Sequence, residues 1–181
     1  RELGVTKGSF YWHFDSRDAL IKAALALWER QTEELIAAAQ KTADAYERLV
    51  ELFKRSNASH KAGRLYLALA ASEDPGVTAV VRRVSARRLS YMQSCYRALG
   101  LGEHEAQHWS TFAYATYLGN QLVHRDAPQR FPEGPPFRDY FKLMVKTLIP
   151  RLAPGATADS HPHVVRMPRA WARVSTTSMV C

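Results

Sequence analysis

The sequence has little of several features that define large protein classes. Its 181 residues include only two cysteines, Cys95 and Cys181, which fit neither a disulfide framework nor the spacing of a metal knuckle. No stretch approaches the roughly 18 consecutive apolar residues of a membrane-spanning helix. The hydrophobic fraction of 46% is too high for a disordered chain. These absences favour one soluble globular domain in a reducing compartment, which we expect to be the cytoplasm.

Acidic residues are also scarce relative to basic ones. The chain has 25 Lys and Arg against 17 Asp and Glu, which gives a formal net charge of +8. A basic balance of this size favours an anionic partner, with nucleic acid as the first candidate. The excess is concentrated in two stretches, because residues 82–97 contribute +5 and residues 151–181 contribute +3. The remainder of the chain sums to zero.

Apolar residues recur at spacings of three and four between Ser16 and about Leu152, and β-branched runs are few. This pattern predicts an all-α fold. We expect a long helix from Arg17 to about Lys41, capped by Asp15 or Ser16. Its expected apolar stripe comprises Leu20, Ala24, Leu27, Trp28, Leu35 and Ala38. Turns rich in Pro and Gly separate the further predicted helices, at about 44–59, 62–73, 76–99, 103–126 and 137–151.

The segment 3–17 has the features of a short helix that enters a DNA groove. Gly4 permits a tight turn between helices, and Thr6 can cap a helix that ends near Phe14. Val5, Phe10 and Phe14 would share the buried side. The opposite side carries hydrogen-bond donors and aromatic rings, namely Lys7, Ser9, Tyr11, Trp12 and His13. A short helix with such an outer face suits the major groove.

The run from Val5 to Phe14, followed by Ser16-Arg17 and Ala19-Leu20, resembles the helix-turn-helix of the TetR family of transcriptional regulators. The resemblance implies that the short helix is the recognition helix and that the next, long helix leads into a helical ligand-binding body. It further implies phosphate contacts from Thr6, Lys7, Tyr11, His13 and Arg17. Base-edge contacts would come from Gly8, Ser9 and Tyr11, with Trp12 in a backbone or packing contact.

In that family a first helix and most of a second precede the recognition helix, so we expect a truncated head on a multi-helix ligand-binding and dimerisation bundle. The expected divisions are a remnant of the DNA-binding domain at 1–16, a helical body at 17–153 and an irregular, mobile tail at 154–181. The resemblance implies a ligand-responsive repressor that binds a palindromic double-stranded DNA operator as a homodimer. An unknown small molecule would release it. Neither catalysis nor a cofactor, a metal or a membrane is expected.

Two features of the body bear on ligand binding and assembly. Aromatic side chains are spread through it, and they form either its core or the wall of a pocket between helices. For the pocket we favour Trp28, Tyr66, Tyr91 and Trp109. The helices 103–126 and 137–151 are apolar over more surface than one neighbour would cover, which predicts a four-helix dimer interface. On the first of them, this face comprises Trp109, Phe112, Ala113, Thr116, Gly119 and Val123.

Two other functions compete with DNA binding. The chain could be a helical ligand-binding or interaction bundle without a DNA function. Alternatively, His104-Glu105-Ala106-Gln107-His108 fits H-E-x-x-H, in which two histidines hold zinc and the glutamate is a general base. A third zinc ligand is hard to find, because Glu133 lies in a proline-rich loop and His124 is too far along the same helix. We therefore favour a helix start with incidental histidines.

Two smaller features have ordinary interpretations. The cluster Arg82, Arg83, Arg87 and Arg88 predicts a solvated helix face, with an acidic ligand or a partner subunit as alternatives. We expect Cys95 to be a small core residue or a mildly exposed thiol, because no His or Asp near it in the sequence has the spacing of a residue that would activate a nucleophilic cysteine.

Overall fold

The computed structural model describes residues 16–57 and 60–151, and within these ranges the chain is helical, without a strand. This confirms the all-α prediction. Each predicted helix begins and ends within three residues of the corresponding observed helix. The predicted recognition helix and the predicted tail lie outside the described residues. The helices are α2 (Arg17–Gln40), α3 (Ala45–Asn57), α4 (His60–Ala70), α5 (Pro75–Ala98), α6 (Glu103–Asp126) and α7 (Pro135–Leu148), with the 3₁₀ helix η1 (Pro128–Arg130) before α7. None of these described helices is long and apolar enough to cross a membrane.

Local sequence fixes where the two long helices α2 and α5 begin. The Ser16 hydroxyl accepts a hydrogen bond from the backbone N–H of Ala19 at 3.1 Å, so Ser16 is the N-cap of α2. The Asp74 carboxylate accepts one from the N–H of Val77 at 3.0 Å, and a proline occupies the first position of α5. Both arrangements satisfy backbone donors that a helix start leaves unpaired.

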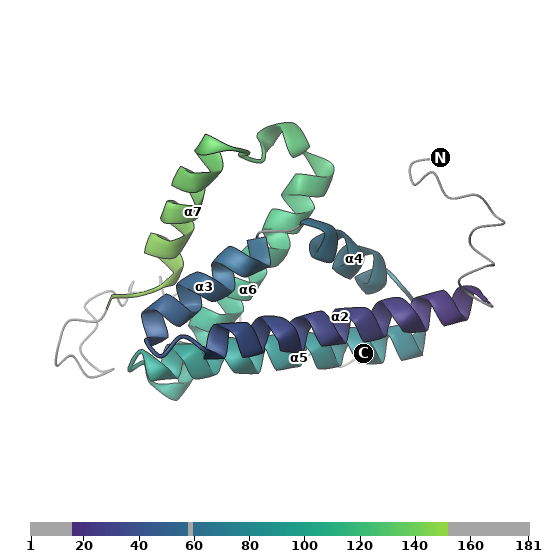
Figure 1. Ribbon diagram of the computed structural model, residues 1–181, viewed down its shortest axis with the longest axis horizontal. Helices are drawn as coiled ribbons and strands as arrows, with labels where there is room; N and C mark the ends of the chain where they lie inside the picture. The colour runs from purple at the N-terminus through teal and green to yellow at the C-terminus, as the bar shows by residue number, and fades with distance from the viewer. Residues whose placement is uncertain (1–15, 58–59, 152–181) are drawn as a thin grey trace, which may run out of the picture.

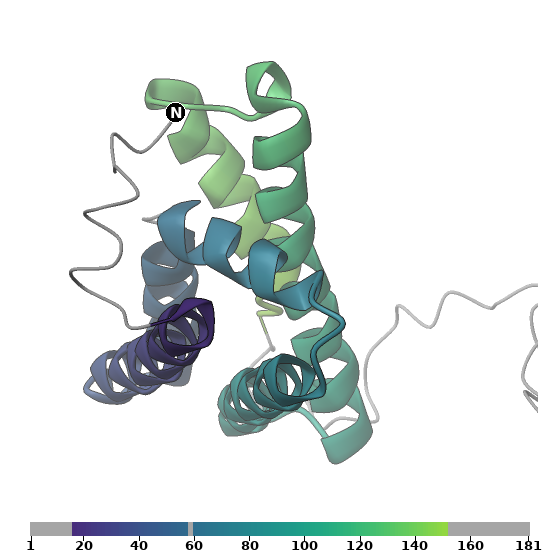
Figure 2. The same cartoon turned by 90° about the vertical axis from the view of Figure 1, so that its right-hand side faces the viewer.

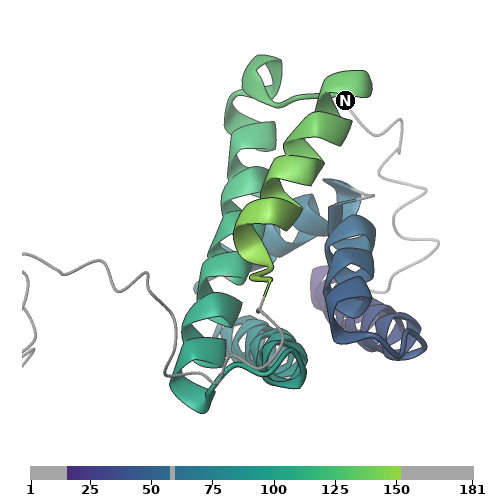
Figure 3. The same ribbon diagram turned by 90° about the vertical axis from the view of Figure 1, so that its left-hand side faces the viewer.

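The helices α2 and α5 lie side by side along most of their length (Figure 1). They run in the same direction, because residues that pair across them advance together along both helices. The helix α6 leaves the end of α5 at a steep angle, and α7 runs back beside it (Figures 2 and 3). Between these pairs, α3 packs against α2, α5 and α7, while α4 packs against α6, α5 and α2.

The apolar interior is divided into two clusters. The smaller cluster lies between the first halves of α2 and α5 and the helix α4, and it consists of Leu25, Trp28, Leu69, Val77 and Val84. The larger cluster joins the second halves of α2 and α5 to α3, α6 and α7, and it includes Ile36, Leu49, Leu52, Phe53, Met92, Cys95, Tyr96, Ala113, Met144 and Leu148. The α2–α5 pair is therefore common to both clusters.

The buried face of α2 agrees with the predicted stripe at Trp28, and Leu35 and Ala38 are partly buried, but the stripe was wrong at Leu27. Leu27 was placed on the stripe but is 39% exposed. The buried face comprises Leu25, Trp28, Thr32, Ile36 and Ala39. A polar residue, Thr32, lies at the centre of this face and is only 1% exposed. Its hydroxyl is hydrogen-bonded to Arg88, and no pattern of hydropathy could indicate that a threonine is buried for this reason.

Two residues of α5 anchor the larger cluster. The Tyr96 hydroxyl donates a 2.7 Å hydrogen bond to the backbone carbonyl of Leu148, which is the last residue of α7. This bond satisfies a carbonyl that the helix end would otherwise leave unpaired. Burial raises the pKa of the Tyr96 phenol, so it stays a donor. Cys95 is fully buried beside it, which confirms the core interpretation of that cysteine.

Candidate functional site

The predicted DNA-contacting residues lie almost entirely outside the described part of the chain. Arg17 is the exception, because it is the first residue of α2 and is exposed to solvent. Its contact with phosphate therefore stays a prediction. The same holds for the predicted contacts of Thr6, Lys7, Gly8, Ser9, Tyr11, Trp12 and His13, which lie outside the described residues.

A pocket opens within the larger cluster, where α2, α3, α5, α6 and α7 meet. It occupies about 560 Å³, including the open solvent at its mouth. Its wall is mostly apolar, with major contributions from Ile36, Leu52, Phe53, Met92, Met144 and Leu148.

Seven residues of the wall carry polar side-chain atoms, and three of them bear on ligand binding: Asn57, Arg88 and Tyr91. The other four are Ser56, Tyr114, Thr116 and Tyr117. The Asn57 amide nitrogen donates to the backbone carbonyl of Phe53 at 2.8 Å, but its Oδ1 is buried without a hydrogen-bond partner. The Tyr91 hydroxyl is also buried and unpaired. Burial raises the pKa of Tyr91 to about 12, with a smaller contribution from Cys95, so the phenol is neutral. Unpaired buried polar atoms are uncommon in folded proteins.

Of the four residues predicted to line a pocket, the structure places one, Tyr91, on this wall. Trp28 and Tyr66 pack against each other around the smaller cluster, with ring centroids 5.6 Å apart. Trp109 lies against Tyr96, with ring centroids 6.3 Å apart, at the edge of the larger cluster. The structure does not bring these three to the pocket that contains Tyr91.

The four predicted pocket residues did not include Arg88 or Asn57. For the arginine cluster that contains Arg88, an acidic ligand was an alternative to a solvated face. The solvated basic face was the favoured interpretation for all four arginines. Successive residues of a helix point about 100° apart around its axis, so adjacent arginines cannot all face the same way. Nothing in the sequence shows which of several neighbouring arginines turns inward. Asn57 gave no signal, because it is a polar residue at the expected end of a helix.

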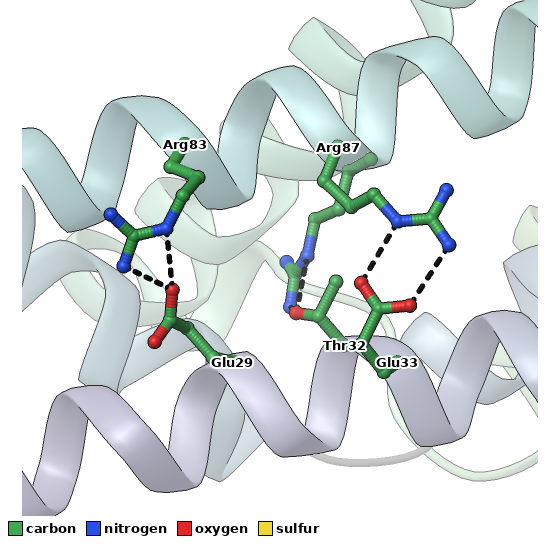
Figure 4. Close-up of polar contacts among 6 residues, drawn as sticks. Glu29, Thr32, Glu33, Arg83 and Arg87 are labelled. Carbon is green, nitrogen blue, oxygen red and sulfur yellow. Dashed lines mark hydrogen bonds and ion pairs between the residues drawn. The ribbon is translucent and has the colours of Figure 1, made fainter.

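Two of the clustered arginines tie α5 to α2, as Figure 4 shows. Arg83 donates from Nε to a Glu29 carboxylate oxygen at 2.9 Å, and Nη2 donates to the same oxygen. Arg87 binds Glu33 through two bonds of 2.8 and 2.9 Å, and this pairing lowers the pKa of the Glu33 carboxyl. The expected solvated face is therefore solvated but also ion-paired across helices.

Arg88 behaves differently from these neighbours. Its Nε and Nη2 donate to the hydroxyl of Thr32, at 3.0 and 2.8 Å, so its partner on α2 is neutral. Its guanidinium carbon lies 5.2 Å from the ring centroid of Trp28 and 6.0 Å from that of Tyr117. Trp28 belongs to the smaller cluster and Tyr117 packs against the larger one. Arg88 therefore stands at the boundary between the clusters, beside the pocket.

The H-E-x-x-H residues lie in the first turns of α6. His104 and His108 are both exposed. Across residues 16–57 and 60–151, no group of three or more His, Cys, Asp and Glu is placed to hold a metal ion. His124 and Glu133, the weak third-ligand candidates, lie near each other at the far end of α6, with 3.8 Å between Nε2 and Oε1.

The apolar face predicted for dimerisation is divided between core and solvent. Ala113 is buried, whereas Phe112 on α6 is 51% exposed and Leu143 on α7 is 58% exposed. Val123 is also exposed, and a Cβ added at Gly119 would meet nothing within 4 Å. Phe112, Thr116, Gly119 and Val123 recur at helical spacing, so they form one stripe along α6.

Comparison with known proteins finds a similarity in the N-terminal segment. The family model of bacterial regulatory proteins, tetR family, matches residues 1–24. The matched range contains the whole motif at 3–17 and the first two turns of α2. Neither a curated protein nor a solved structure matches the chain. The similarity is thus confined to the end of the chain that carries the motif.

Proposed function

We propose that the chain is a ligand-responsive repressor of the TetR type that binds a near-palindromic operator as a homodimer. The observation that carries this proposal is the match over residues 1–24, which coincides with the ordered motif from Leu3 to Arg17. The match supports a DNA-binding transcriptional regulator, and the motif assigns roles within it. All described residues lie in a helical body, as a ligand-binding and dimerisation bundle requires.

The recognition helix would span about Thr6 to Phe14. Lys7 and Arg17 would contact phosphates, while Ser9 would reach base edges and Gly8 would allow the backbone to approach closely. In a two-fold dimer the two recognition helices would enter successive major grooves, about 34–36 Å apart. The operator would then repeat its half-sites with inverted symmetry.

The dimer would form through α6 and α7. Support comes from the exposed Phe112 and Val123 on α6, which lie on one stripe with Gly119, and from the exposed Leu143 on α7. Large apolar side chains that stay exposed on one face commonly mark an interaction surface. A second copy of the same stripe can cover them with a two-fold axis, since such an interface is self-complementary.

Release from DNA would follow from the preference of a ligand for one conformation of the dimer. A small molecule in the pocket between α2, α3, α5, α6 and α7 would favour a spacing of the recognition helices that does not fit the operator. It can shift the equilibrium only by its differential affinity for the two conformations. The helix α2 is the natural connection, because it begins directly after the motif and ends in the larger cluster.

Binding of the complete gene product to the DNA upstream of its own gene, measured by gel shift at several salt concentrations, tests the DNA function. Lys7→Ala should weaken binding to all sequences and reduce the slope of log K against log salt by about one. Ser9→Ala should change the sequence preference and preserve the slope. Lys41→Ala, at an exposed position beyond α2, serves as the control and should change neither. Absence of DNA binding would refute the proposal, and an unchanged slope in Lys7→Ala would refute the phosphate contact.

Sedimentation measurements test the dimer separately. Phe112→Glu and Leu143→Glu should each raise the dimer dissociation constant by about ten-fold or more, because each buries a charge in the proposed interface. Leu27→Glu is the matched control, since Leu27 is a comparably exposed apolar residue on α2. A wild-type chain that stays monomeric at micromolar concentration would contradict the dimer, as would equal effects of all three substitutions.

A further inference from the structure

Arg88 lacks the carboxylate partner that its neighbours have. Arg83 and Arg87 each bind a glutamate of α2, whereas the two hydrogen bonds of Arg88 go to the neutral Thr32 hydroxyl. Across this part of the α2–α5 contact, three guanidinium groups face two carboxylates. One positive charge is therefore uncompensated, and it belongs to the half-buried member of the set.

Partial burial makes this arrangement costly unless something offsets it. A charged group removed from water loses solvation, and hydrogen bonds to a neutral hydroxyl replace it only in part. The rings of Trp28 and Tyr117 supply some attraction as cation–π partners. An anion at the guanidinium would supply considerably more, because charge-assisted and bidentate bonds to arginine are the stronger kind.

The position of Arg88 shows where that anion would come from. Arg88 lines the pocket, and the wall around it is mostly apolar. Two more wall residues, Asn57 and Tyr91, present buried polar atoms without a partner, one an acceptor and the other a hydroxyl. Among the described residues that line this mostly apolar pocket, the guanidinium is the one cationic group, and two unpaired polar groups lie in the same wall. This arrangement complements an organic molecule that has an apolar body and one anionic end.

We propose that the pocket binds a small organic monocarboxylate, with its apolar body against the wall and its carboxylate on Arg88, and that this pairing draws Arg88 away from Thr32. The proposal gives the chemical class of the effector in the proposed function, and it rests on that function for its regulatory meaning. The ligand-binding part does not depend on DNA.

The bond to Thr32 is what connects the pocket to α2. Thr32 is buried at the centre of the α2 face, between the ion pairs of Glu29 and Glu33. When the carboxylate takes the Arg88 donors, the Thr32 hydroxyl loses both of its bonds from α5. The contact between the two long helices then depends on the exposed ion pairs, and such pairs hold less firmly than buried contacts.

Calorimetric titration of the full chain with two matched pairs of compounds tests the ligand class. The acids are benzoate and octanoate, and the neutral controls are benzamide and octanamide. We expect each acid to bind about ten-fold or more tightly than its amide, since hydrogen bonds to a charged group are the stronger kind. Equal affinity for acid and amide would overturn the proposal, and so would the failure of both acids to bind at millimolar concentration.

Two glutamine variants locate the charge. Arg88→Gln should abolish the preference for acid over amide, whereas Arg87→Gln, one residue away, should preserve it. Equal loss in both variants would overturn the assignment to Arg88. If Arg88→Gln fails to fold by circular dichroism, Thr32→Val gives the answer instead. Removal of the competing hydroxyl should strengthen acid binding several-fold and leave amide binding unchanged, and unchanged or weaker acid binding would contradict the proposed exchange of partners.

Failure of this inference and failure of the proposed function give different results. If the acids bind by calorimetry but the chain binds no DNA, the effector class stands and the repressor function fails. If the chain binds DNA but neither acid binds, the function stands and the effector class fails. If both bind, added benzoate or octanoate should release DNA from the wild type, and release should be lost in Arg88→Gln.

Discussion

The smaller and the larger cluster pack against the same two helices, yet they are built differently. The smaller cluster has five buried members, grouped around the single large side chain of Trp28. The larger cluster has several aromatic and aliphatic anchors from five helices, and it contains the pocket. Loss of one side chain should therefore disturb only its neighbours in the larger cluster, whereas in the smaller cluster it should disturb the packing of the whole cluster. Under the proposed function, the larger cluster would bind the ligand and the smaller cluster would respond to it.

The largest effect is expected when the side chain at the centre of the smaller cluster is removed. Trp28→Ala should lower the free energy of unfolding by about 3–5 kcal/mol, because a fully buried tryptophan leaves a large cavity. Hydrogen exchange should then show loss of protection in α4 and the first half of α2. Trp28→Phe is the control, and it should cost much less because it keeps a ring and removes an unpaired indole N–H.

Leu49→Ala is the corresponding change in the larger cluster. It should cost about 2–5 kcal/mol in urea denaturation, since Leu49 is fully buried. Protection in α4 should survive, because many other anchors remain around α3. Equal loss of protection throughout the chain in both alanine variants would show that the two clusters are one cooperative unit.

A smaller effect is expected where α4 approaches α6. A Cβ at Gly63 would overlap the side chain of Gln121, which is itself buried. Gly63→Ala must displace that side chain, and overpacking of this kind costs about 1–3 kcal/mol. Gly119→Ala on α6 is the matched control, because open space surrounds its position. There alanine should stabilise the helix by about 0.5–1 kcal/mol at a concentration where the chain is monomeric. A stabilising Gly63→Ala would contradict the close packing.

The smallest effect at neutral pH, and one that grows with pH, is expected at Tyr91. Its pKa in the folded protein is about 12, above the value of about 10 for an unfolded tyrosine. The neutral phenol is therefore favoured by folding. Its contribution to stability is complete below pH 10 and is lost as the pH rises from 10 towards 12.

Urea midpoints of the wild type and Tyr91→Phe at pH 7, 10 and 11 measure this dependence. The two should differ by less than about 1 kcal/mol at pH 7, because the hydroxyl has no hydrogen-bond partner. At pH 11 the wild type should have lost more stability than the variant. Tyr96 and Tyr114, whose pKa values are also raised by burial, retain part of the alkaline sensitivity in both proteins. Parallel losses in the two proteins would contradict the assignment to Tyr91.

Sequence periodicity predicted the helices well, because the local signals for their ends are strong. Ser16 and the Asp74-Pro75 pair place the starts of α2 and α5 without reference to tertiary structure. Periodicity oriented α2 only in part, because a hydropathy pattern counts Leu27 as core and Thr32 as surface. Their true burial depends on what α5 presents opposite them, and this is information from another part of the chain.

The same limit applies to the candidate pocket. Tyr91 was predicted to line a pocket only because aromatic residues often line cavities. The same reason applied to Trp28, Tyr66 and Trp109, so it could not show which of the four line the pocket. The charged residue of the wall was harder still, because Arg87 and Arg88 are adjacent and chemically identical. Only the glutamate opposite Arg87 and the threonine opposite Arg88 distinguish them, and these lie more than fifty residues earlier in the chain. The motif at 3–17 was predictable because its information is entirely local.

Because α2 is long, a small rotation of the helix at Thr32 displaces its N-terminal end by a much larger distance. An α-helix rises about 1.5 Å per residue, so the stretch from Thr32 back to the N-cap at Ser16 is about 24 Å long. A tilt of roughly 5° about Thr32 would displace the start of α2 by about 2 Å on that helical rise. In a two-fold dimer the displacement occurs on both sides of the axis. An angular change too small to disturb the packing at the pocket is thus amplified at the far end into a translation comparable to the length of a hydrogen bond.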